Sequence, residues 1–478
     1  MRKSGNSSFV LPDAVRIISN GSQHILVNTN NLAWVKISDP LCKIVSHLGM
    51  VGYAKMKAQV IRNHHVSEKD MRKSLEFLAA RGILDKVTGH DADDLQHHSL
   101  DIMGCERMDA PVYIGTMHNP GVLLDVTDRC NLKCPYCYVG NYLSHVSVGA
   151  DPPLAQISQI ASALAPLRPA SINLSGGEPL LRSDLVDIIA TLLDIADTPI
   201  FMNTNGALLT ASICDRIAPL LAGVSVSLDG STAELHDSIA GVQGTFDKVI
   251  NGIRNLQDAG LSRIVITSTI CRQNLNDLPN MIEVAKSLDA RFSSSFLVPT
   301  GCASINSEAL LITGEEESKL EEQCWRKCLK LGYPEYPSDP FYRGYVRFAR
   351  MRCPAFNSLY ILTDGSIYPC PALRSQSEFY IGNAFEHDSI VDLIQTSPVV
   401  SKLASLHADH NPRTPECGDC DVRYFCGGGC LGLELNTEDC SRKKERLRKR
   451  LWQYQDGLSL SENIAAMYGK QPSQGSAE

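Results

Sequence analysis

The chain has 478 residues, of which 44% are hydrophobic, and this predicts a globular protein of two or three domains. Its net charge of -8 excludes the broad basic field that nucleic acid or an acidic membrane surface would need, so we expect neither as a partner. The start of the chain lacks a signal-peptide pattern and no apolar run is long enough to span a bilayer, which predicts a cytoplasmic location.

The N-terminal segment predicts a small α+β domain of winged-helix-like form over residues 1–90. Short β-like runs at 14–18 and 24–27 alternate with helical patterns at 39–48 and 66–80, and Gly82 ends the second helix. Residues 91–119 are aperiodic, and we expect a linker there.

Six apolar strands separated by helical stretches are expected between residues 120 and 320. The strands are 122–127, 171–177, 199–206, 223–230, 263–270 and 292–299, with helices at 184–196, 246–259 and 277–288. Strands that alternate with helices predict a parallel α/β sheet, arranged as a (β/α) barrel or a doubly wound sheet. Most strands end in Gly, Cys, Asn, Asp or Pro, so we expect the active site at their carboxyl ends.

The rest of the chain divides into a connecting region, a cysteine-rich domain and a tail. We expect mainly helical, connecting structure up to residue 350, with the connecting region at 321–350. Short strands and Gly/Pro turns follow over 351–445, and their short apolar runs predict a domain that a bound cluster helps to hold together. Over 446–478 we expect one amphipathic helix, with Leu447, Leu451 and Tyr454 at helical spacing, and a polar tail.

The seventeen cysteines of so large a chain without a secretion signal indicate metal binding or catalysis rather than disulfides. Three of them, Cys130, Cys134 and Cys137, stand in the loop CNLKCPYCY directly after the first strand. Three ligands leave one coordination position open for a substrate, as in catalytic zinc sites and open iron-sulfur clusters. The purely sulfur ligand set favours an iron-sulfur cluster over zinc.

This CxxxCxxC loop, with Tyr136 before the last cysteine, resembles that of the radical S-adenosylmethionine (SAM) superfamily. The resemblance implies a partial (β/α)6 TIM-type barrel, a 4Fe-4S cluster and bound SAM. SGGEP and the later strand ends match the family's SAM-contacting positions, which are Gly176, Gly177, Glu178, Pro179, Asn205, Ser227 and Asp229. A strand-end Ser or Asp is otherwise a helix cap. Ala240 replaces an arginine that many relatives carry.

The later cysteines resemble the family's SPASM domain, which holds two auxiliary 4Fe-4S clusters. The resemblance assigns Cys353, Cys370 and Cys430 to the first cluster and Cys417, Cys420, Cys426 and Cys440 to the second. A zinc ribbon is the alternative for an isolated CxxC. The first cluster lacks a fourth cysteine, for which Cys302, Cys324 and Cys328 are spare candidates that we interpret as ordinary packed thiols.

The N-terminal segment resembles the PqqD-like element by which peptide-modifying enzymes bind a precursor peptide through its leader, added as an extra strand. A winged-helix DNA binder is the alternative, and it lacks a basic recognition helix here. The combined resemblance implies an enzyme that abstracts hydrogen from a ribosomally made peptide by a 5′-deoxyadenosyl radical and installs a crosslink. A thioether is the first expectation, and a C–C or C–O link is the next.

Two other enzyme functions stay open. One is sulfatase maturation by formylglycine generation, against which Pro371 stands where those relatives carry an aspartate. The other is radical modification of a tetrapyrrole side chain, which would leave the N-terminal domain without a task. An iron-sulfur redox regulator without catalysis would make SGGEP vestigial. Radical chemistry also needs an electron donor such as flavodoxin or ferredoxin. No side chain is assigned as acid or base.

Overall fold

The structure is a computed structural model. It describes residues 7–20, 23–28, 34–38, 40–46, 48–49, 53, 56–57, 67–88, 120–139, 151–196, 198–333, 353–408, 414–426, 428–433, 437–453 and 458–469. The expected linker and the part of the connecting region after residue 333 lie outside this set, as do Tyr454 and the last nine residues.

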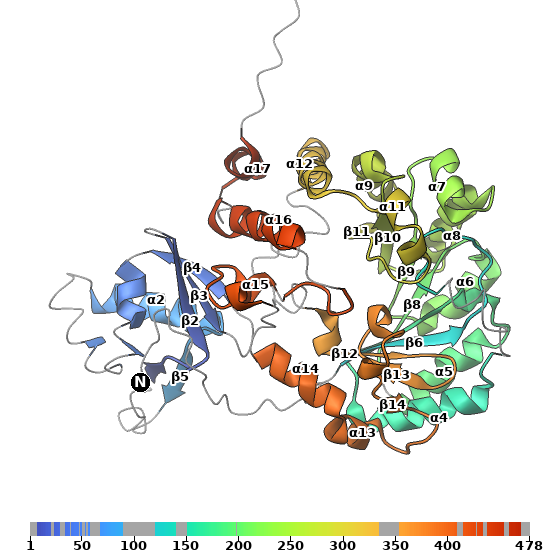
Figure 1. Cartoon of the computed structure of the whole chain (residues 1–478), viewed down its shortest axis with the longest axis horizontal. Helices are drawn as coiled ribbons and strands as arrows, with labels where there is room; N and C mark the ends of the chain where they lie inside the picture. The colour runs from blue at the N-terminus through green and yellow to red at the C-terminus, as the bar shows by residue number, and fades with distance from the viewer. Residues whose placement is uncertain are drawn as a thin grey trace, which may run out of the picture.

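The six expected strands form one parallel sheet, as predicted (Figure 1). They are β6 (Gly121–Thr127), β7 (Ser171–Gly176), β8 (Ile200–Thr204), β9 (Gly223–Ser227), β10 (Ile264–Ile270) and β11 (Arg291–Phe296), paired in this order. The helices between them are α4 (Leu154–Leu164), α5 (Leu185–Ala196), α6 (Ala211–Ile217), α7 (Ala233–Ala240), α8 (Thr245–Asp258) and α9 (Leu278–Ser287). This architecture is consistent with the expected partial TIM-type barrel.

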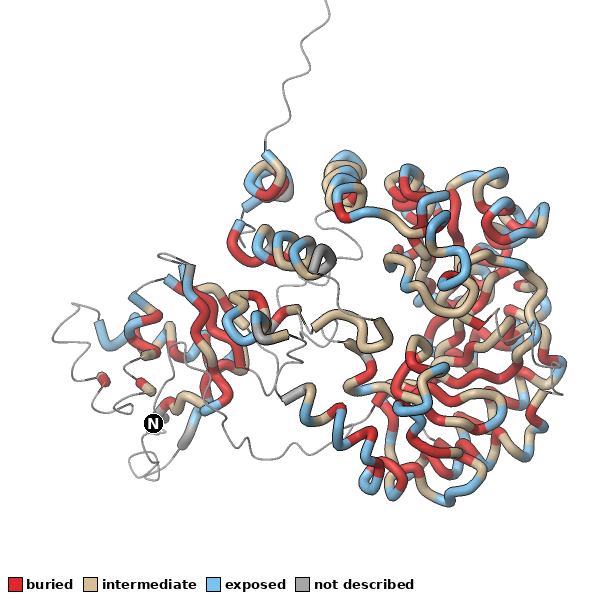
Figure 2. The backbone as a smooth tube through the Cα atoms, in the orientation of Figure 1, coloured by how far each residue is buried: buried red, intermediate tan, exposed pale blue. Residues whose placement is uncertain are grey.

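Successive side chains of each strand point to opposite faces of the sheet, and the apolar core lies on the face that the helices cover. On β6, Val122, Leu124 and Val126 are fully buried in the apolar cluster that also contains the inner faces of α4 and α5. Figure 2 shows this core as buried tube running along the strands. Asp125 therefore belongs to the opposite face of β6, which is the inner side of the barrel.

The cysteine-rich domain joins the barrel sheet directly, which the sequence did not predict. β12 (Ser358–Ile361) pairs in parallel with β6, with Tyr360 opposite Leu123. β13 (Ser366–Tyr368) and β14 (Gly382–Asn383) continue the sheet in antiparallel fashion to nine strands. Helices α13 (Ile390–Thr396) and α14 (Pro398–Ala408) follow. The two domains thus share one hydrogen-bonded sheet.

The expectation of one helix in the C-terminal stretch was wrong. α16 (Thr437–Arg448) runs into a π-helical turn at Lys449–Gln453, and a separate α17 spans Leu460–Tyr468. A capping box starts α17, since Ser459 accepts from the backbone of Glu462 and Glu462 accepts from that of Ser459. The expected domain boundary at residue 320 also falls inside a helix, α12 (Gly314–Lys330).

The N-terminal domain has a three-stranded antiparallel sheet of β2 (Val15–Asn20), β3 (Gln23–Asn28) and β4 (Trp34–Ser38). α2 (Glu68–Ala80) starts at the cap Ser67 and ends before Gly82, whose φ of 71° suits glycine, as predicted. β1 (Ser7–Val10) pairs with β5 (Asp85–Thr88). Val15, Leu26 and other residues of one sheet face pack with α2.

The other face of this sheet packs against the cysteine-rich domain. Ile18, Ile25 and Val27 form an apolar cluster with residues of the C-terminal domain, namely Val422, Phe425, Leu447, Leu451 and Trp452. The ring of Trp34 meets that of Phe425 edge-on at 5.9 Å, and Figure 1 places α15 (Arg423–Cys426) beside β2 and β3. Both faces of the sheet are therefore covered. No helix within the described residues has the length and apolarity needed to cross a membrane.

Candidate functional site

The loop with Cys130, Cys134 and Cys137 follows β6 at the carboxyl edge of the sheet, and the three thiols are partly buried. Burial raises the pKa of Cys134, and the nearby charges of Asp229, Cys137 and Cys130 raise it further. Cys134 therefore lies within electrostatic reach of the other two sulfurs, and the assignment of all three to one cluster stays a prediction.

The two glycines of SGGEP let this segment lie directly against the cysteine loop. The amide of Gly177 donates to the carbonyl of Thr127, and that of Glu178 to the carbonyl of Arg129, each at 2.8 Å. A Cβ atom on Gly177 would lie 2.0 Å from the Arg129 oxygen, and one on Gly176 would lie 2.2 Å from the Thr127 oxygen. Glycine is thus required by the close approach of two backbones.

Gly177→Ala should lose iron from the loop site and destabilise the fold by about 1–3 kcal/mol, because a methyl group has no room beside the Arg129 carbonyl. Iron content and thermal unfolding of the variant would measure both effects. Gly121→Ala on β6 is the matched control, since its Cβ would meet only a side-chain oxygen at 4.0 Å. Equal iron content in the two variants would contradict this account of the glycine pair.

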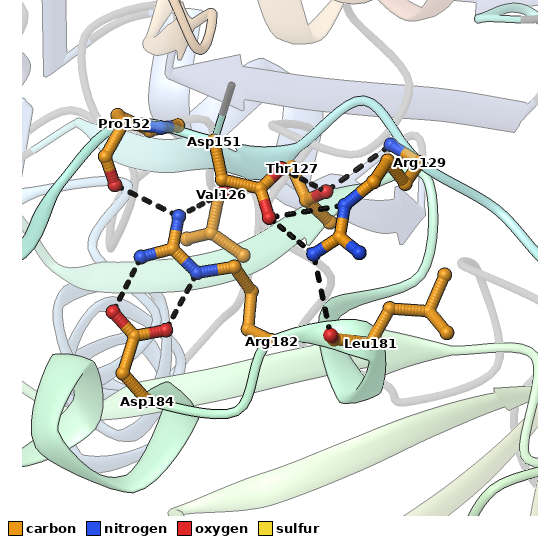
Figure 3. Close-up of polar contacts among 8 residues, drawn as sticks. All are labelled: Val126, Thr127, Arg129, Asp151, Pro152, Leu181, Arg182 and Asp184. Atoms are coloured by element: carbon orange, nitrogen blue, oxygen red, sulfur yellow. Dashed lines mark hydrogen bonds and ion pairs between the residues drawn. The ribbon is translucent and has the colours of Figure 1, made fainter. Parts of the chain in front are cut away.

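Two arginines fix the backbone beneath the loop (Figure 3). Arg182 makes a bidentate pair with Asp184, with both contacts at 2.7 Å, and donates to the carbonyls of Val126 and Pro152. Arg129 pairs with Asp151, which also accepts from the hydroxyl of Thr127 at 2.6 Å. These bonds connect the end of β6 to the start of α4 and to the segment after β7. The sequence did not identify this scaffold.

Glu178 lies fully buried and connects the ends of β7 and β8. Its carboxylate accepts from the Thr204 hydroxyl and the Asn205 amide, each at 2.7 Å, and from the Leu180 amide at 3.0 Å. Burial raises its pKa to about 6. The Asn205 side chain in turn donates to Asn131 at 2.8 Å, inside the cysteine loop. Both predicted residues therefore lie beside the loop and position it.

Two of the predicted site residues, Tyr136 and Asp229, are hydrogen-bonded to each other. The tyrosine hydroxyl donates to the carboxylate, which also accepts from the Thr269 amide at 2.8 Å. Burial raises the pKa of both groups. Ser227 lies at the end of β9, two residues before Asp229, and Pro179 begins a short 3-10 turn at the end of SGGEP. Every predicted cofactor-binding residue is thus at this edge of the barrel.

The remaining cysteines have electrostatic neighbours within each predicted group, and their assignment to two clusters stays a prediction. Burial raises the pKa of Cys370, followed by the charges of Cys353 and Cys430. Burial also raises the pKa of Cys440, and the charges of Cys426, Cys417 and Cys420 raise it further.

The donor sets suit iron-sulfur clusters, since each group offers sulfur alone and burial penalises free thiolates that metal would stabilise. Within the described residues, no three His, Cys, Asp or Glu side chains converge as for a single metal ion. Cubane ligands bind different irons and need not converge on one point. The groups therefore fit clusters better than zinc.

The spare cysteines lie on two helices of the described structure. Cys324 and Cys328 on α12 are fully buried in the main apolar core. Cys302 lies in the short helix α10 (Cys302–Ile305), and its amide donates to the carbonyl of Cys137 at 2.9 Å, beside the first loop. Their interpretation as ordinary thiols stays a prediction, and the fourth ligand of the first auxiliary group stays unassigned.

A cavity of about 280 Å³ is lined by residues of both the barrel and the cysteine-rich domain. Gly301 and Ser304 line it on the barrel side, and Ala372, Ser375, Gln376 and Gly432 line it on the other. Gly301 lies against the backbone of Cys137, whereas Ala372 and Gly432 are each two residues from a cysteine of the first auxiliary group. The cavity is therefore placed between two cluster sites.

A buried polar group on the inner face of β6 escaped the sequence analysis. The Tyr360 hydroxyl donates to the Asp125 carboxylate and accepts from Arg374 at 3.2 Å. The Tyr138 ring lies edge-on to that of Tyr360 at 6.5 Å, and its hydroxyl lies 3.4 Å from that of Ser175. Burial raises the pKa of Asp125 to about 7, although Tyr360 and Arg374 lower it. No sequence motif signals this group, because it assembles from three separate segments.

Comparison with known proteins gives two domain matches. The radical SAM superfamily matches residues 124–285, and the iron-sulfur cluster-binding domain SPASM matches residues 353–421. The PqqA peptide cyclase of Rhodopseudomonas palustris is 33% identical over 325 residues, which cover 65% of this chain and 81% of that protein. The AdoMet-dependent heme synthase of Methanosarcina barkeri is 36% identical over 182 residues, or 37% of this chain and half of that protein.

A similar fold occurs in the crystal structure of Streptococcus suis SuiB bound to precursor peptide SuiA. The TM-score is 0.54 at 17% identity, over 89% of this chain and 96% of that one.

Proposed function

Because the chain belongs to the radical SAM superfamily, with a SPASM cluster-binding domain, we propose that it matures a ribosomally made precursor peptide by hydrogen abstraction and crosslinking. The similarity to a peptide cyclase carries this proposal, since it extends over 81% of that enzyme and 65% of this chain. The three cysteine groups support it by supplying sulfur ligands at three places.

The cofactors are SAM, one 4Fe-4S cluster at Cys130, Cys134 and Cys137, and two auxiliary 4Fe-4S clusters. When bound and reduced, the first cluster and SAM supply the 5′-deoxyadenosyl radical that abstracts hydrogen. The chain's own part is to hold and orient: Glu178 and Asn205 fix the loop to the strand ends, and Tyr136 fixes it to Asp229.

The N-terminal domain is proposed to hold the leader of the peptide at a sheet edge. Both faces of its sheet are covered, one by α2 and the other by the cysteine-rich domain. Of the strands that the structure describes here, β2 and β4 are the edges and pair on one side each. An extended peptide can add to such an edge through backbone hydrogen bonds. This supports the PqqD-like interpretation over a DNA-binding one.

N-methylation of leader amides tests the edge-strand mode. In an added strand, alternate amides point toward the protein and donate to it. Methylating those amides should weaken binding by about tenfold or more, equal to about 1.4 kcal/mol. Methylating the intervening amides, which point away, is the matched control and should leave affinity unchanged. Equal losses along the leader, measured by titration calorimetry, would argue against strand addition.

The bond formed is proposed to be a thioether between a cysteine sulfur and a carbon of the peptide. The three-cysteine auxiliary group supports this choice, since an open iron can bind a substrate thiolate. A C–C or C–O link is the next possibility. The electron donor is proposed to be a flavodoxin or ferredoxin in the cytoplasm.

Co-expression with a short neighbouring reading frame tests the function. A peptide that loses two hydrogens by mass spectrometry only when the intact enzyme is present supports crosslinking. An unchanged mass for every small neighbouring product counts against it.

Tetrapyrrole modification is the second candidate, because the heme synthase is 36% identical over its shared 182 residues. That match covers half of the synthase, whereas the peptide cyclase match covers 81% of the cyclase. Incubating the reconstituted enzyme with SAM, reductant and an iron porphyrin distinguishes the two. Formylglycine generation is less supported, since Pro371 follows Cys370.

A further inference from the structure

The proposed crosslink removes two hydrogens from the peptide, and the second needs a proton acceptor. The first leaves carbon as a hydrogen atom and gives 5′-deoxyadenosine. Bonding of that carbon to a thiol, hydroxyl or C–H partner also breaks the X–H bond of the partner, and its proton is released. A thiol releases this proton either when the new bond forms or earlier, when its sulfur binds an open iron. The remaining electron needs a one-electron acceptor, and an auxiliary 4Fe-4S cluster held by the cysteine-rich domain would supply that chemistry. This argument rests on the proposed function.

We propose that Asp125 receives this proton through the hydroxyl of Tyr360. The hydroxyl donates to the carboxylate and accepts from Nη1 of Arg374 at 3.2 Å. A tyrosine hydroxyl both donates and accepts, so it can pass its own proton to Asp125 while it takes one from the substrate. Asp125 is the only carboxylate to which Tyr360 donates in the described contacts.

The position of the group fits this task. Asp125 faces the inner side of the barrel, since its neighbours Leu124 and Val126 face the helices. Arg374 directly precedes Ser375 and Gln376, which line the cavity between the barrel and the first auxiliary group. Tyr138 extends the group to Ser175, next to the SAM-contacting glycines. The cavity therefore borders the segment that carries Arg374, whose guanidinium contacts the Tyr360 hydroxyl.

The second carboxylate oxygen of Asp125, Oδ1, is buried and can still accept a hydrogen bond or a proton. Within the described part of the chain no donor reaches Oδ1, although the residue is only 1% exposed. An unsatisfied buried oxygen is costly, and one that persists in a fold calls for an explanation. A carboxyl that merely anchored β12 to β6 would be expected to use both oxygens, as Asp237 does with the amides of Gly244 and Phe246.

The charges around Asp125 predict how the reaction depends on pH. They come from Tyr360 on β12, Tyr138 after the cysteine loop, Arg374 after the η8 turn (Pro371–Leu373), and Asp128. Burial raises the pKa of Asp125 to about 7, while Tyr360 and Arg374 lower it. A proton acceptor must be ionised, so crosslinking should increase as pH rises through about 7. Tyr360→Phe and Arg374→Gln should each shift this rise to higher pH.

The experiment measures crosslinked peptide and 5′-deoxyadenosine together, in the cluster-loaded full chain. Asp125→Asn should lower the yield of crosslink by about 10²–10⁴-fold while 5′-deoxyadenosine still forms, because Asp125 takes the partner's proton and has no part in hydrogen abstraction. The matched control is Asp237→Asn, another buried carboxyl, which should keep the wild-type ratio and pH profile. Iron content of each variant checks that the fold and its clusters are retained.

An infrared measurement needs no peptide. The difference spectrum of wild type minus Asp125→Asn should show a protonated carboxylic acid well below pH 7 that disappears well above it. An ionised carboxylate throughout, or an unchanged ratio of crosslink to 5′-deoxyadenosine in Asp125→Asn, overturns the proposal while the proposed function stands. Failure of wild type itself to modify any peptide overturns the proposed function, and Asp125 loses this role with it.

Discussion

Replacing Cys130, Cys134 and Cys137 together with alanine is expected to abolish formation of 5′-deoxyadenosine. The change removes every protein ligand of the cluster that would reduce SAM, and the structure places the three thiols beside one another at the end of β6. After anaerobic reconstitution the variant should hold about eight irons where the wild type holds about twelve, since two auxiliary groups remain. Iron analysis and chromatography of the SAM products measure both effects.

Cys214→Ala serves as the control for this experiment. Cys214 is a buried thiol of α6, within the apolar core. Its replacement should therefore leave the iron content and SAM cleavage of the wild type. Cleavage of SAM by the triple variant would contradict the assignment of this loop. A loss of all twelve irons would instead mean that the auxiliary sites depend on the first one.

Replacing Cys417 and Cys420 with alanine is expected to eliminate peptide modification and to loosen the N-terminal domain. The second auxiliary group lies at its interface, since Cys420 and Cys426 pack against the cluster that contains Ile25 and Phe425. Binding energy of a metal site is folding energy, so an empty site should weaken this contact. The expected readouts are about eight retained irons, continued formation of 5′-deoxyadenosine and faster release of the N-terminal domain by protease.

Cys328→Ala is the control for the interface experiment. Cys328 is fully buried on α12, in the main core and away from the interface. Its variant should keep iron content and protease resistance close to those of the wild type. Normal protease resistance in the double variant, with one cluster missing, would show that the N-terminal domain docks without the second auxiliary cluster.

Local patterns predicted the elements because those elements depend on short-range rules. The six barrel strands and the helices at 184–196, 246–259 and 277–288 were predicted to within three residues at each end, since each segment carries its own apolar periodicity. The same patterns failed at α16 and α17. The break between them depends on the capping box at Ser459 and Glu462, which the apolar spacing of a single long helix hides.

The sequence alone predicted the chemistry of this protein, because the cysteine spacing and the order of SGGEP, Ser227 and Asp229 are properties of the chain itself. Tertiary structure decided which groups act on one another. It joined β12 to β6, packed the N-terminal sheet on the second auxiliary group, and gave Glu178 three internal bonds. It also brought Asp125, Tyr360 and Arg374 together from three segments, because burial and pairing across a sheet depend on folding and not on sequence proximity.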